Sequence, residues 1–306
     1  MNYCGVLNID KPEGLTSREI VNHVDRLVRP AKVGHAGTLD PLATGVLVVC
    51  VGHATRLVTL AQEGRKRYLA RFELGKTSDT DDITGTVDAG GEWTHLTEDD
   101  ITRLLPLFTG RIAQVPPQFS AVHVKGERAY HLARRGETVE IEARPVDVYS
   151  LRLTEFQLPG IELEIECGSG TYVRSIGRDL GHRLGCGAVM TKLRRTAVGP
   201  FEVSDAITLD SLTPETIAAS LQPALRIAQH LPQRVLSPQE TVSVRRGQAI
   251  RLGIPLSVFE EGGPPQTSEP PCVPRAALVD ADEVLIGIGE VDFTTSRLHP
   301  RIIFPN

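Results

Sequence analysis

The 306-residue sequence predicts an α+β fold followed by a small all-β domain. In the first part, segments of strand-like alternation are mixed with segments of helical periodicity, and no internal repeat is evident. Near the C-terminal end, short alternating segments surround the turn-rich stretch 260–271. We therefore expect one large domain over residues 1–235 and a smaller one over residues 236–306.

The first helix is expected after Thr16, because Thr16 and Glu19 form the pattern of a capping box. The apolar residues behind it keep helical spacing: Ile20, Val21, Val24, Leu27 and Val28. The continuous apolar run 46–51 is typical of a buried strand. The alternation over 68–74 is typical of a strand that is covered on one face.

A strand and a helix are expected on either side of the glycine-rich turn 168–170. Residues 161–167 alternate cleanly, and a helix should begin near Thr171 and stop at Gly185. The apolar face of this helix comprises Val173, Ile176, Leu180 and Leu184. The stretch 116–144 is rich in Arg, Lys, His and aromatic residues, so we expect it to leave the core. Short strands of the C-terminal domain are expected at 242–245, 276–279 and 284–289.

The charge balance permits a nucleic-acid partner without requiring one. The chain has 33 Lys and Arg against 38 Asp and Glu, for a net charge of −5. Residues 167–200, however, carry six basic residues against the single acid Asp179, whereas residues 81–166 carry eight against sixteen. A locally basic surface can attract a polyanion even on an acidic protein.

Cysteine usage and hydropathy indicate a cytoplasmic protein. Five cysteines are scattered without a C-x-x-C pair, which favours neither a zinc site nor a disulfide framework. Cys50 and Cys167 lie in apolar runs and are expected to be buried. We find no signal-peptide pattern and no apolar stretch of membrane-spanning length.

Asp40 is the first candidate for chemistry. It lies between Leu39 and Pro41, after a glycine-flanked turn and before the predicted strand 46–51. Because Pro41 disfavours helix at the preceding residue, the carboxylate is expected on a shaped loop. The alternative is an aspartate that accepts hydrogen bonds from nearby amides of a turn, and this segment alone does not decide between the two.

Arg174 is the second candidate, in the first turn of the predicted helix. A guanidinium there could pair with a buried carboxylate, and such a partner would explain a cation at a helix N-terminus. The alternative is an ordinary surface arginine. The turn 168–170 before the helix also suggests a second hypothesis, a phosphate-binding site at the helix N-terminus. The turn lacks the spacing of the known nucleotide-binding motifs.

Aromatic residues beside basic ones suggest contacts with an unstacked base. Tyr68 follows Lys66 and Arg67, and Tyr172 lies two residues before Arg174. Such rings can stack on a base while neighbouring cations contact phosphates. Each tyrosine could equally be a core residue, and His35 could be a hydrogen-bonded turn residue. His and Cys do not cluster as metal ligands would.

Five ordered motifs resemble the bacterial TruB family of tRNA pseudouridine synthases. They are Gly5-Val-Leu-Asn-Ile-Asp-Lys-Pro-Glu-Gly14, residues 34–45 around Asp40, Arg65-Lys-Arg-Tyr68, Gly168-Ser-Gly-Thr-Tyr-Val-Arg174 and Leu193-Arg-Arg-Thr-Ala-Val-Gly-Pro-Phe201. The resemblance implies a pseudouridine synthase fold, with a mixed, largely antiparallel sheet flanked by helices. It further implies a reduced PUA-like C-terminal domain, although that part of the match is much weaker.

Carried over residue by residue, the resemblance implies that Asp40 is the essential nucleophile or base. Arg174 would be its ion-pair partner, and Tyr68 would stack on the target uracil. The other residues would contact or support the RNA: His35 in the opened T loop, Tyr172 and Leu193 along the base pocket, and Lys11 near Asp40.

The stretch 116–144 resembles the RNA-gripping insertion of this family, and Lys125 within it is expected to contact RNA. His123 stands where a lysine would be expected, which puts one phosphate contact in doubt or makes it pH-dependent. The insertion favours the stand-alone bacterial enzyme over relatives that work with guide RNAs.

The implied reaction isomerises uridine to pseudouridine in the T loop of tRNA, at position 55 of the tRNA, after the base is flipped out. It needs neither a metal nor a redox cofactor. The implied partner is the T arm of tRNA, with the acceptor end as a further contact of the C-terminal domain. No protein partner is implied and a monomer is expected. The alternative from another class is an RNA-binding protein or tRNA-folding chaperone that needs no catalysis. A glycosidase is disfavoured, because no second catalytic carboxylate accompanies Asp40.

Overall fold

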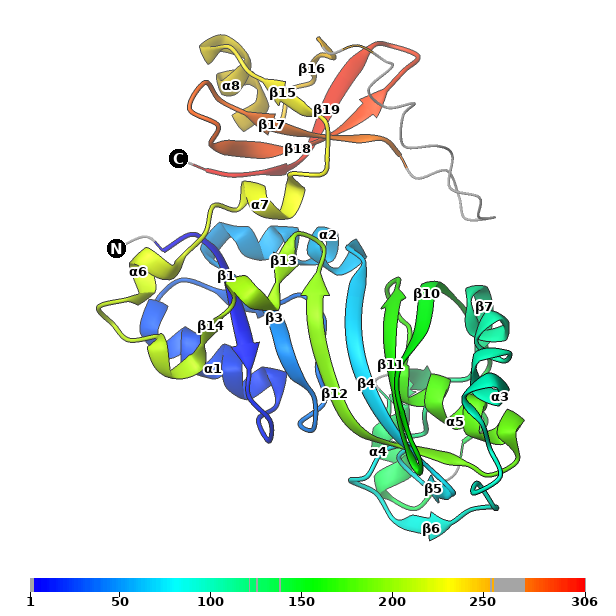
Figure 1. Cartoon of the computed structure of the whole chain (residues 1–306). Coiled ribbons are helices and arrows are strands. Elements are labelled where there is room, and N and C mark those ends of the chain that lie inside the picture. The colour runs from blue at the N-terminus through cyan, green and yellow to red at the C-terminus, as the bar shows by residue number, and fades with distance from the viewer. Residues whose placement is uncertain are drawn as a thin grey trace.

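The computed structural model describes residues 3–120, 122–124, 126–137, 139–253, 255 and 273–305 (Figure 1). Two sheets dominate it. The larger one belongs to the first part of the chain, and the smaller one forms a separate layer at the C-terminal end, above the larger sheet in Figure 1. The expected α+β class is confirmed.

The larger sheet is mixed and largely antiparallel, as expected. Its strand order is β14-β1-β3-β12-β4-β11-β10-β7, with β2 paired to β3 and β13 paired to β12. The pairs β1–β14 and β3–β12 are parallel. The strands are β1 (Gly5–Lys11), β2 (Val33–His35), β3 (Thr44–Val51), β4 (Lys66–Leu74), β7 (Gly110–Gln114), β10 (Arg144–Gln157), β11 (Gly160–Cys167), β12 (Ala188–Val198), β13 (Phe201–Glu202) and β14 (Ile207–Thr208).

The two predicted helices of the large domain are confirmed. Helix α1 (Ser17–Val28) begins with the expected capping box, in which Thr16 accepts a hydrogen bond from the Glu19 amide. Helix α5 (Val173–Leu184) ends at Gly185, which takes the left-handed conformation that favours glycine. Apolar residues of α1 pack on β1 and β3, and those of α5 pack on β4 and β12.

Burial explains the two strand patterns read from the sequence. Strand β3 is covered on both faces, by α1 on one side and by η1 (Gly52–Leu57) and α2 (Val58–Glu63) on the other. A strand buried on both faces is apolar throughout. Strand β4 alternates because one face packs against α5 and the other is open to solvent.

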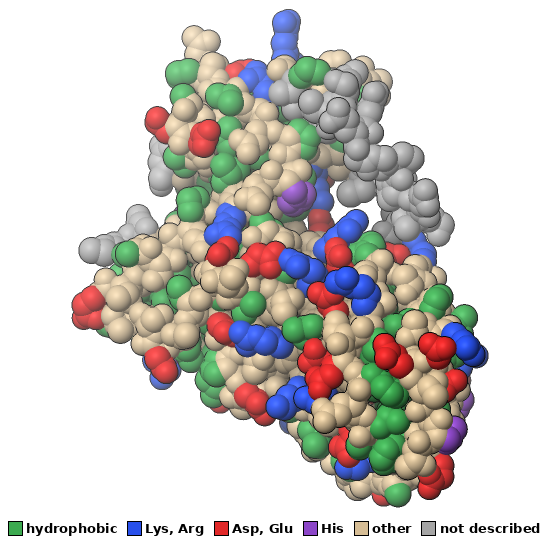
Figure 2. Space-filling model, in the orientation of Figure 1, with side chains coloured by type: hydrophobic (Ala, Val, Ile, Leu, Met, Phe, Trp, Pro, Cys, Tyr) green, Lys and Arg blue, Asp and Glu red, His purple; other side chains and the backbone are tan. Residues whose placement is uncertain are grey.

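The open face of the sheet carries paired charges. Arg65 lies 3.2 Å from Glu166, and Arg71 lies 3.2 Å from Glu155. Arg67 pairs with Glu202 on the same face. Figure 2 shows acidic and basic side chains interleaved over the middle of the molecule. Because opposite charges alternate here, this face does not present the continuous basic surface that a nucleic-acid backbone requires.

The stretch 116–144 leaves the main core, as expected. It contains β8 (His123–Val124), β9 (Glu127–Arg128) and α4 (Ala129–Arg134). A small apolar cluster of its own holds it together: Val122, Ala129 and Ile141, with Tyr172 packed against them. His123 is exposed on β8, whereas Lys125 lies outside the described residues.

The short elements β5 (Lys76–Ser78), β6 (Val87–Ala89), α3 (Glu98–Thr102) and η2 (Leu105–Phe108) connect β4 to β7. After β13 the chain passes through η3 (Val203–Asp205), β14, η4 (Leu209–Ser211), α6 (Ile217–Ser220) and α7 (Leu225–Ala228) to the C-terminal unit. Within the described part of the chain, no helix has the length and apolar character needed to cross a membrane.

The C-terminal sheet has the order β15-β17-β18-β19-β16. Its strands are β15 (Gln233–Val235), β16 (Ile250–Arg251), β17 (Arg275–Val279), β18 (Leu285–Asp292) and β19 (Arg297–Ile303). The strands predicted at 276–279 and 284–289 are confirmed. Because β15 pairs with β17, this sheet begins three residues before the expected boundary at residue 236.

The strand predicted at 242–245 is wrong. These residues belong to helix α8 (Pro238–Arg245). Ser237 and Glu240 form a capping box, and Pro238 occupies the first helical position, where proline is favoured. Local start signals therefore outweighed the short alternation of Val242 and Val244.

The C-terminal sheet packs directly against the larger unit. Ile227 and Ala228 of α7 share one apolar cluster with Leu60 of α2 and with Ala277 and Phe304 of the C-terminal unit. Arg275 also forms an ion pair with Glu63 across this boundary. The two units thus share a buried apolar contact.

Candidate active site

Asp40 lies in the loop between β2 and β3, and the start of α1 holds this loop in place. The Leu39 amide donates to the Ser17 hydroxyl at 2.8 Å, and that hydroxyl donates to the Leu39 carbonyl at 3.1 Å. On the other side of Asp40, the Gly14 amide donates to the Pro41 carbonyl at 2.8 Å. The carboxylate therefore projects from a loop that is fixed on both sides.

Arg174 connects Asp40 to three other groups. Its guanidinium lies 3.0 Å from the Asp40 carboxylate and 3.6 Å from that of Asp82. It also donates to the Thr80 carbonyl at 2.7 Å and to the Phe119 carbonyl at 3.1 Å. The Arg174 side chain is 7% exposed, whereas that of Asp40 is 40% exposed. The arginine thus supports Asp40 from inside the protein and leaves the carboxylate open on its outer side.

Sequence reasoning did not find Asp82. Its side chain is 5% exposed, and its Oδ1 accepts from the Thr80 hydroxyl at 2.8 Å and from the Thr84 amide at 2.9 Å. Burial keeps this carboxylate away from a substrate, so it holds Arg174 rather than acting as a second catalytic acid. The threonines beside Asp82 in the sequence were the one signal that could have indicated a fixed carboxylate.

Tyr68 and Leu193 lie on neighbouring strands beside the Asp40 loop. Both side chains are buried in one apolar cluster with Leu39 and Ala43, the residues near Asp40 in the sequence. Burial raises the pKa of Tyr68 above its ordinary value, so the phenol is neutral at physiological pH. The two side chains provide an apolar wall close to the carboxylate.

Tyr172 precedes α5 and is held through its backbone. The buried amide of Gln114 accepts from the Tyr172 N–H at 2.8 Å and donates to the Tyr172 carbonyl at 3.0 Å. Gln114 ends β7, directly before the excursion 116–144, and the sequence analysis did not single it out. Gln114 thus fixes the backbone of Tyr172, the residue directly before the first helical residue Val173.

His35 ends β2 and is half-buried near the loop of Asp40. Burial and the positive charge of Arg195 lower the pKa of His35, so its ring is neutral at physiological pH. Its Nδ1 atom is buried without a hydrogen-bond partner among the described residues.

Lys11 supports the loop through carbonyl oxygens rather than through an ion pair with Asp40. Its buried ammonium donates to the carbonyls of Pro12 at 2.8 Å, Leu15 at 2.6 Å and Pro41 at 3.3 Å. Burial lowers the pKa of Lys11 to about 8, an effect that the nearby Asp40 charge opposes. The expected position of Lys11 near Asp40 agrees with the structure.

Lys66 and Arg67 are not placed as phosphate ligands beside Tyr68. Lys66 is 6% exposed, donates to the Gln62 carbonyl, and has a pKa lowered to about 8 by burial. Arg67 projects to the opposite, open face of β4, because side chains alternate along a strand, and there it pairs with Glu202. Adjacency in sequence was therefore misleading for both residues.

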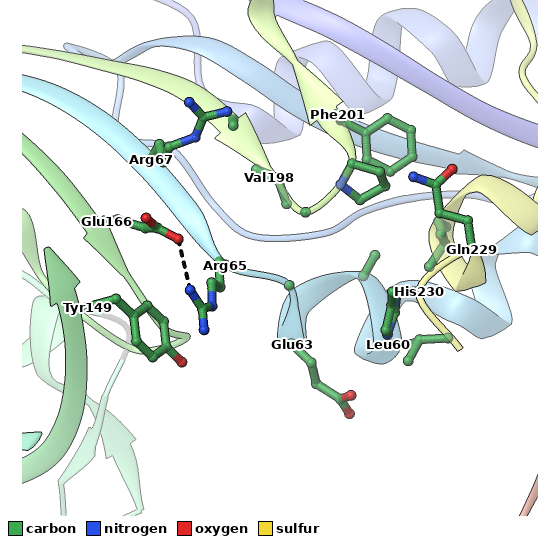
Figure 3. A pocket seen from close by; sticks show the side chains of 16 residues that line it. Leu60, Glu63, Arg65, Arg67, Tyr149, Glu166, Val198, Phe201, Gln229 and His230 are labelled. Carbon is green, nitrogen blue, oxygen red and sulfur yellow. Dashed lines mark hydrogen bonds and ion pairs between the residues drawn. The ribbon is translucent and has the colours of Figure 1, made fainter. Parts of the chain in front are cut away.

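Arg67 lines a separate cavity of about 580 Å³ (Figure 3). Arg65, paired with Glu166 and stacked 4.1 Å over the Tyr149 ring, lies on one side, and Phe201 lies on the other. None of the sequence-predicted site residues except Arg67 lines it. This cavity is therefore distinct from the site around Asp40.

The basic run at 167–200 is not a basic surface. Arg174 and Arg195 are buried, Arg178 pairs with Asp81 at 2.9 Å, and Arg194 pairs with Asp10 at 2.8 Å. Lys192 and Arg183 alone among the six are exposed without a described ion pair. Four of the six are therefore buried or paired within the protein instead of facing a ligand. Among the described residues, no group of three His, Cys, Asp or Glu side chains comes together as metal ligands would.

Comparisons with known proteins agree over most of the chain. The N-terminal domain model of the TruB family pseudouridylate synthases matches residues 25–173, and the tRNA pseudouridylate synthase B C-terminal domain model matches residues 174–242. The chain is 39% identical to the tRNA pseudouridine synthase B of Synechococcus sp., covering 98% of this chain and 97% of that protein. It is 43% identical to the protein of that name from Paenarthrobacter aurescens, covering 81% of each.

A solved structure is similar over almost the whole chain. It is a chain in the crystal structure of a Cbf5-Nop10-Gar1 complex, with a TM-score of 0.72 and 25% identity. The likeness covers 98% of this chain and 85% of that one. It therefore includes the C-terminal sheet as well as the larger unit.

Proposed function

The chain belongs to the TruB family of pseudouridylate synthases, and from this premise we propose that it modifies a uridine in the T arm of tRNA with Asp40 as its catalytic carboxylate. The family reaction is the isomerisation of uridine to pseudouridine in tRNA. The observation that carries the residue assignment is the contact of the half-exposed Asp40 carboxylate with the buried Arg174 guanidinium, at 3.0 Å.

The reaction needs one well-placed carboxylate and a site that accepts a single base. The bond between N1 and C1′ breaks, a bond between C5 and C1′ forms, and the proton lost from C5 is balanced by one gained at N1. Asp40 is open on one side only, so an attacking oxygen points out of the protein toward an incoming nucleotide. Arg174 holds that direction through its ion pair with Asp40.

A base inside folded RNA must leave its stack to reach Asp40, at a cost of about a few kcal/mol. Tyr68 and Leu193 offer it an apolar surface beside the carboxylate, and Tyr172 lies half-buried near the excursion 116–144. Stacking on an aromatic ring offsets part of the cost of unstacking, by about 1–3 kcal/mol per base. We assign the aromatic contact to Tyr68.

The T-arm assignment draws on the groups around this pocket. The half-buried ring of His35 lies near the loop of Asp40, and the excursion 116–144 stands beside Tyr172 where it can close on a stem. Arg144 at its end is exposed, without an ion pair among the described residues, and acts electrostatically on Tyr172. Arg144 replaces Lys66 and Arg67 as our candidate phosphate ligand.

We assign the acceptor end of the tRNA to the C-terminal unit. It carries exposed arginines with no described ion pair: Arg245, Arg246, Arg251 and Arg297. Arg251 and Arg297 lie directly opposite each other on β16 and β19, where like charges repel. A phosphate between them would relieve that repulsion. We further propose that the protein acts as a cytoplasmic monomer that needs no metal or cofactor.

The alternative, an RNA-binding protein or folding chaperone without catalysis, is not favoured. Such a protein has no use for an arginine that is buried beneath a carboxylate and held by Asp82 and two carbonyls. Binding alone is served by exposed cations, and a buried ion pair adds little to it.

Release of tritium from C5-labelled uridine in a tRNA transcript tests the proposal. We expect Asp40→Ala to abolish tritium release. Its affinity for the transcript should stay within about twofold of wild type, since the small Asp40 side chain acts on the reacting atoms and makes few other contacts with the RNA. Asp10→Asn is the matched control, because Asp10 pairs with Arg194 and lies outside the site. Release by Asp40→Ala would overturn the assignment, and mass-spectrometric mapping of the product would report the modified position.

A further inference from the structure

Arg195 is the largest side chain that is completely buried in the described structure, with 1% of its surface exposed. It lies directly opposite Tyr68 on β4 and opposite Gly45 on β3, and Lys11 of β1 lies opposite Gly45 in turn. Residues that face each other across paired strands project to the same side of the sheet. Lys11, Arg195 and Tyr68 therefore form one row on the face that carries Asp40.

Gly45 lets this row form. Its φ of +97° favours glycine, and a Cβ there would lie 2.1 Å from the Arg195 carbonyl oxygen. The close approach of β12 to β3 lets the Arg195 guanidinium reach β3 and the loop before it. Its Nε donates to the Val46 carbonyl at 2.7 Å, and its Nη2 donates to the Gly37 carbonyl at 3.1 Å. Gly37 lies within the loop between β2 and Asp40.

The third contact of Arg195 is the phenol of Tyr68. The two residues face each other across the strand pair, and the Arg195 guanidinium opposes the rise that burial causes in the Tyr68 pKa. One side chain thus holds the loop of Asp40 by its backbone and the ring of Tyr68 by its polar end.

Burial of the Arg195 guanidinium destabilises the fold unless its contacts serve the site. Among the described residues no carboxylate pairs with Arg195, so the guanidinium is buried on neutral acceptors alone. A buried charge is disfavoured unless it is paired, and an apolar side chain of similar volume would fill the space with less penalty. Arg194, the preceding residue, shows the ordinary alternative, since it lies on the other face and pairs with Asp10 at 2.8 Å.

We propose that Arg195 is a positioning residue for the reaction, because its guanidinium ties the Tyr68 phenol to the Gly37 carbonyl and so sets the ring relative to Asp40. The inference rests on the proposed function, in which Asp40 is the catalytic carboxylate and Tyr68 contacts the base. Arg195 touches neither the base nor the carboxylate. It acts through the two residues that do.

Arg195→Met tests the role of the guanidinium, with Arg194→Met as the matched control. A displacement of about 1 Å at a reacting centre can cost about 100-fold in rate. We expect the single-turnover rate of pseudouridine formation to fall about 100-fold in Arg195→Met, with the Kd for tRNA within about twofold of wild type. Arg194→Met should keep the wild-type rate. A wild-type rate in Arg195→Met, or a loss confined to Kd, would overturn the proposal.

A double-mutant cycle with Tyr68→Phe separates positioning from general damage. If Arg195 acts through the phenol, removing the hydroxyl costs about tenfold or more in the wild type, the value of one hydrogen bond to a charged group. The same change should cost less than about twofold in Arg195→Met, because the bond is already gone. An equal factor in both backgrounds would mean that the two residues act independently, and the proposal would fail.

If Arg195→Met does not fold, Arg195→Lys takes its place in the same cycle. Lysine keeps the charge but has one nitrogen in place of the planar guanidinium fork, so the cost of removing the hydroxyl should again be smaller than in wild type. Failure of the proposed function is distinct, because wild-type protein would then form no pseudouridine. Activity in the wild type, none in Asp40→Ala, and equal hydroxyl costs in all backgrounds would overturn the Arg195 inference alone.

Discussion

Replacement of Arg174 by methionine tests how the site is built. Methionine fills a similar volume, but it removes every donor to Asp40, Asp82 and the carbonyls of Thr80 and Phe119. The consequences for the two carboxylates differ, because Asp82 is 5% exposed and Asp40 is 40% exposed. Water can hydrate Asp40 after the substitution, whereas Asp82 is left as a buried charge.

The loss of stability follows from that difference. Removing one partner of a buried ion pair costs about 3–5 kcal/mol. Asp82 keeps its hydrogen bonds from Thr80 and Thr84, at 2.8 and 2.9 Å, so the lower end of that range applies. We expect Arg174→Met to lower the free energy of unfolding by about 3 kcal/mol, most of it from Asp82. Turnover should fall below detection, since Asp40 loses its orientation.

A second substitution, Asp82→Asn, should restore part of the stability and none of the activity. In the double variant the buried charge is gone, and about 1–2 kcal/mol should return. Urea unfolding followed by the fluorescence of Trp93, the single tryptophan, measures the first quantity, and tritium release measures the second. A double variant that is no more stable than Arg174→Met would refute the assigned role of Asp82. A double variant that regains turnover would refute the role of Arg174.

Three further predictions follow from the same geometry. The pKa of Lys11 is about 8 in the folded protein against 10.5 ordinarily. Between these pH values the folded state binds fewer protons than the unfolded state, so the free energy of unfolding should rise with pH. The rise should be up to about 2–3 kcal/mol relative to Lys11→Met. Equal urea titrations of the two proteins at pH 7.5 and pH 10 would contradict this. Gly45→Ala should lower the free energy of unfolding by at least about 2 kcal/mol and abolish most of the activity, because its Cβ would meet a backbone oxygen at 2.1 Å. Gly110→Ala is the control, since Gly110 has a similar positive φ but open space around it. It should lower the free energy of unfolding by only about 1 kcal/mol, measured by thermal unfolding. Arg144→Ala should reduce the slope of log Kd for tRNA against log salt by about one, and Arg67→Ala should leave it unchanged; the reverse result would restore Arg67 as a phosphate ligand.

The open face of the sheet bears on how RNA approaches. Its charges pair along neighbouring strands, as Arg71 does with Glu155 and Arg194 with Asp10. A polyanion finds little net attraction there, while the face with Asp40 presents an unpaired Arg144 at its rim. This arrangement agrees with an overall acidic protein that binds RNA on one side only, since local fields and not net charge govern the encounter.

Several candidate residues could be predicted because their signals are local. The loop of Asp40 follows from proline and glycine beside a buried strand, and helix α5 follows from its apolar spacing and the glycine at its end. Tyr68 follows from the alternation of β4. Gln114, Asp82 and Arg195 could not be found in this way, because their partners lie 58, 92 and 127 positions away in the chain.

The wrong predictions have the same origin. Lys66 and Arg67 were associated with Tyr68 by adjacency, yet alternation sends Arg67 to the other face, and packing against Gln62 buries Lys66. The basic run at 167–200 was interpreted as a surface, although folding turns most of it inward or pairs it. The number of charged residues in a segment does not show which of them are exposed, because burial and ion pairing in the folded protein determine that.

The sequence by itself determined the strands at 46–51, 68–74 and 161–167, the two main helices, the shaped loop of Asp40 and the set of motifs around it. Those features depend on steric preference, periodicity and capping, which act over a few neighbouring residues. Only the tertiary structure decided which charges meet, because the ion pair of Asp40 and Arg174 joins a loop to the first turn of α5, and both are positioned by a sheet whose register neither segment encodes alone. Arg195 meets the loop of Asp40 and Tyr68 through the row that it shares with Lys11, Gly45 and Tyr68. Such a row exists only when four strands are aligned.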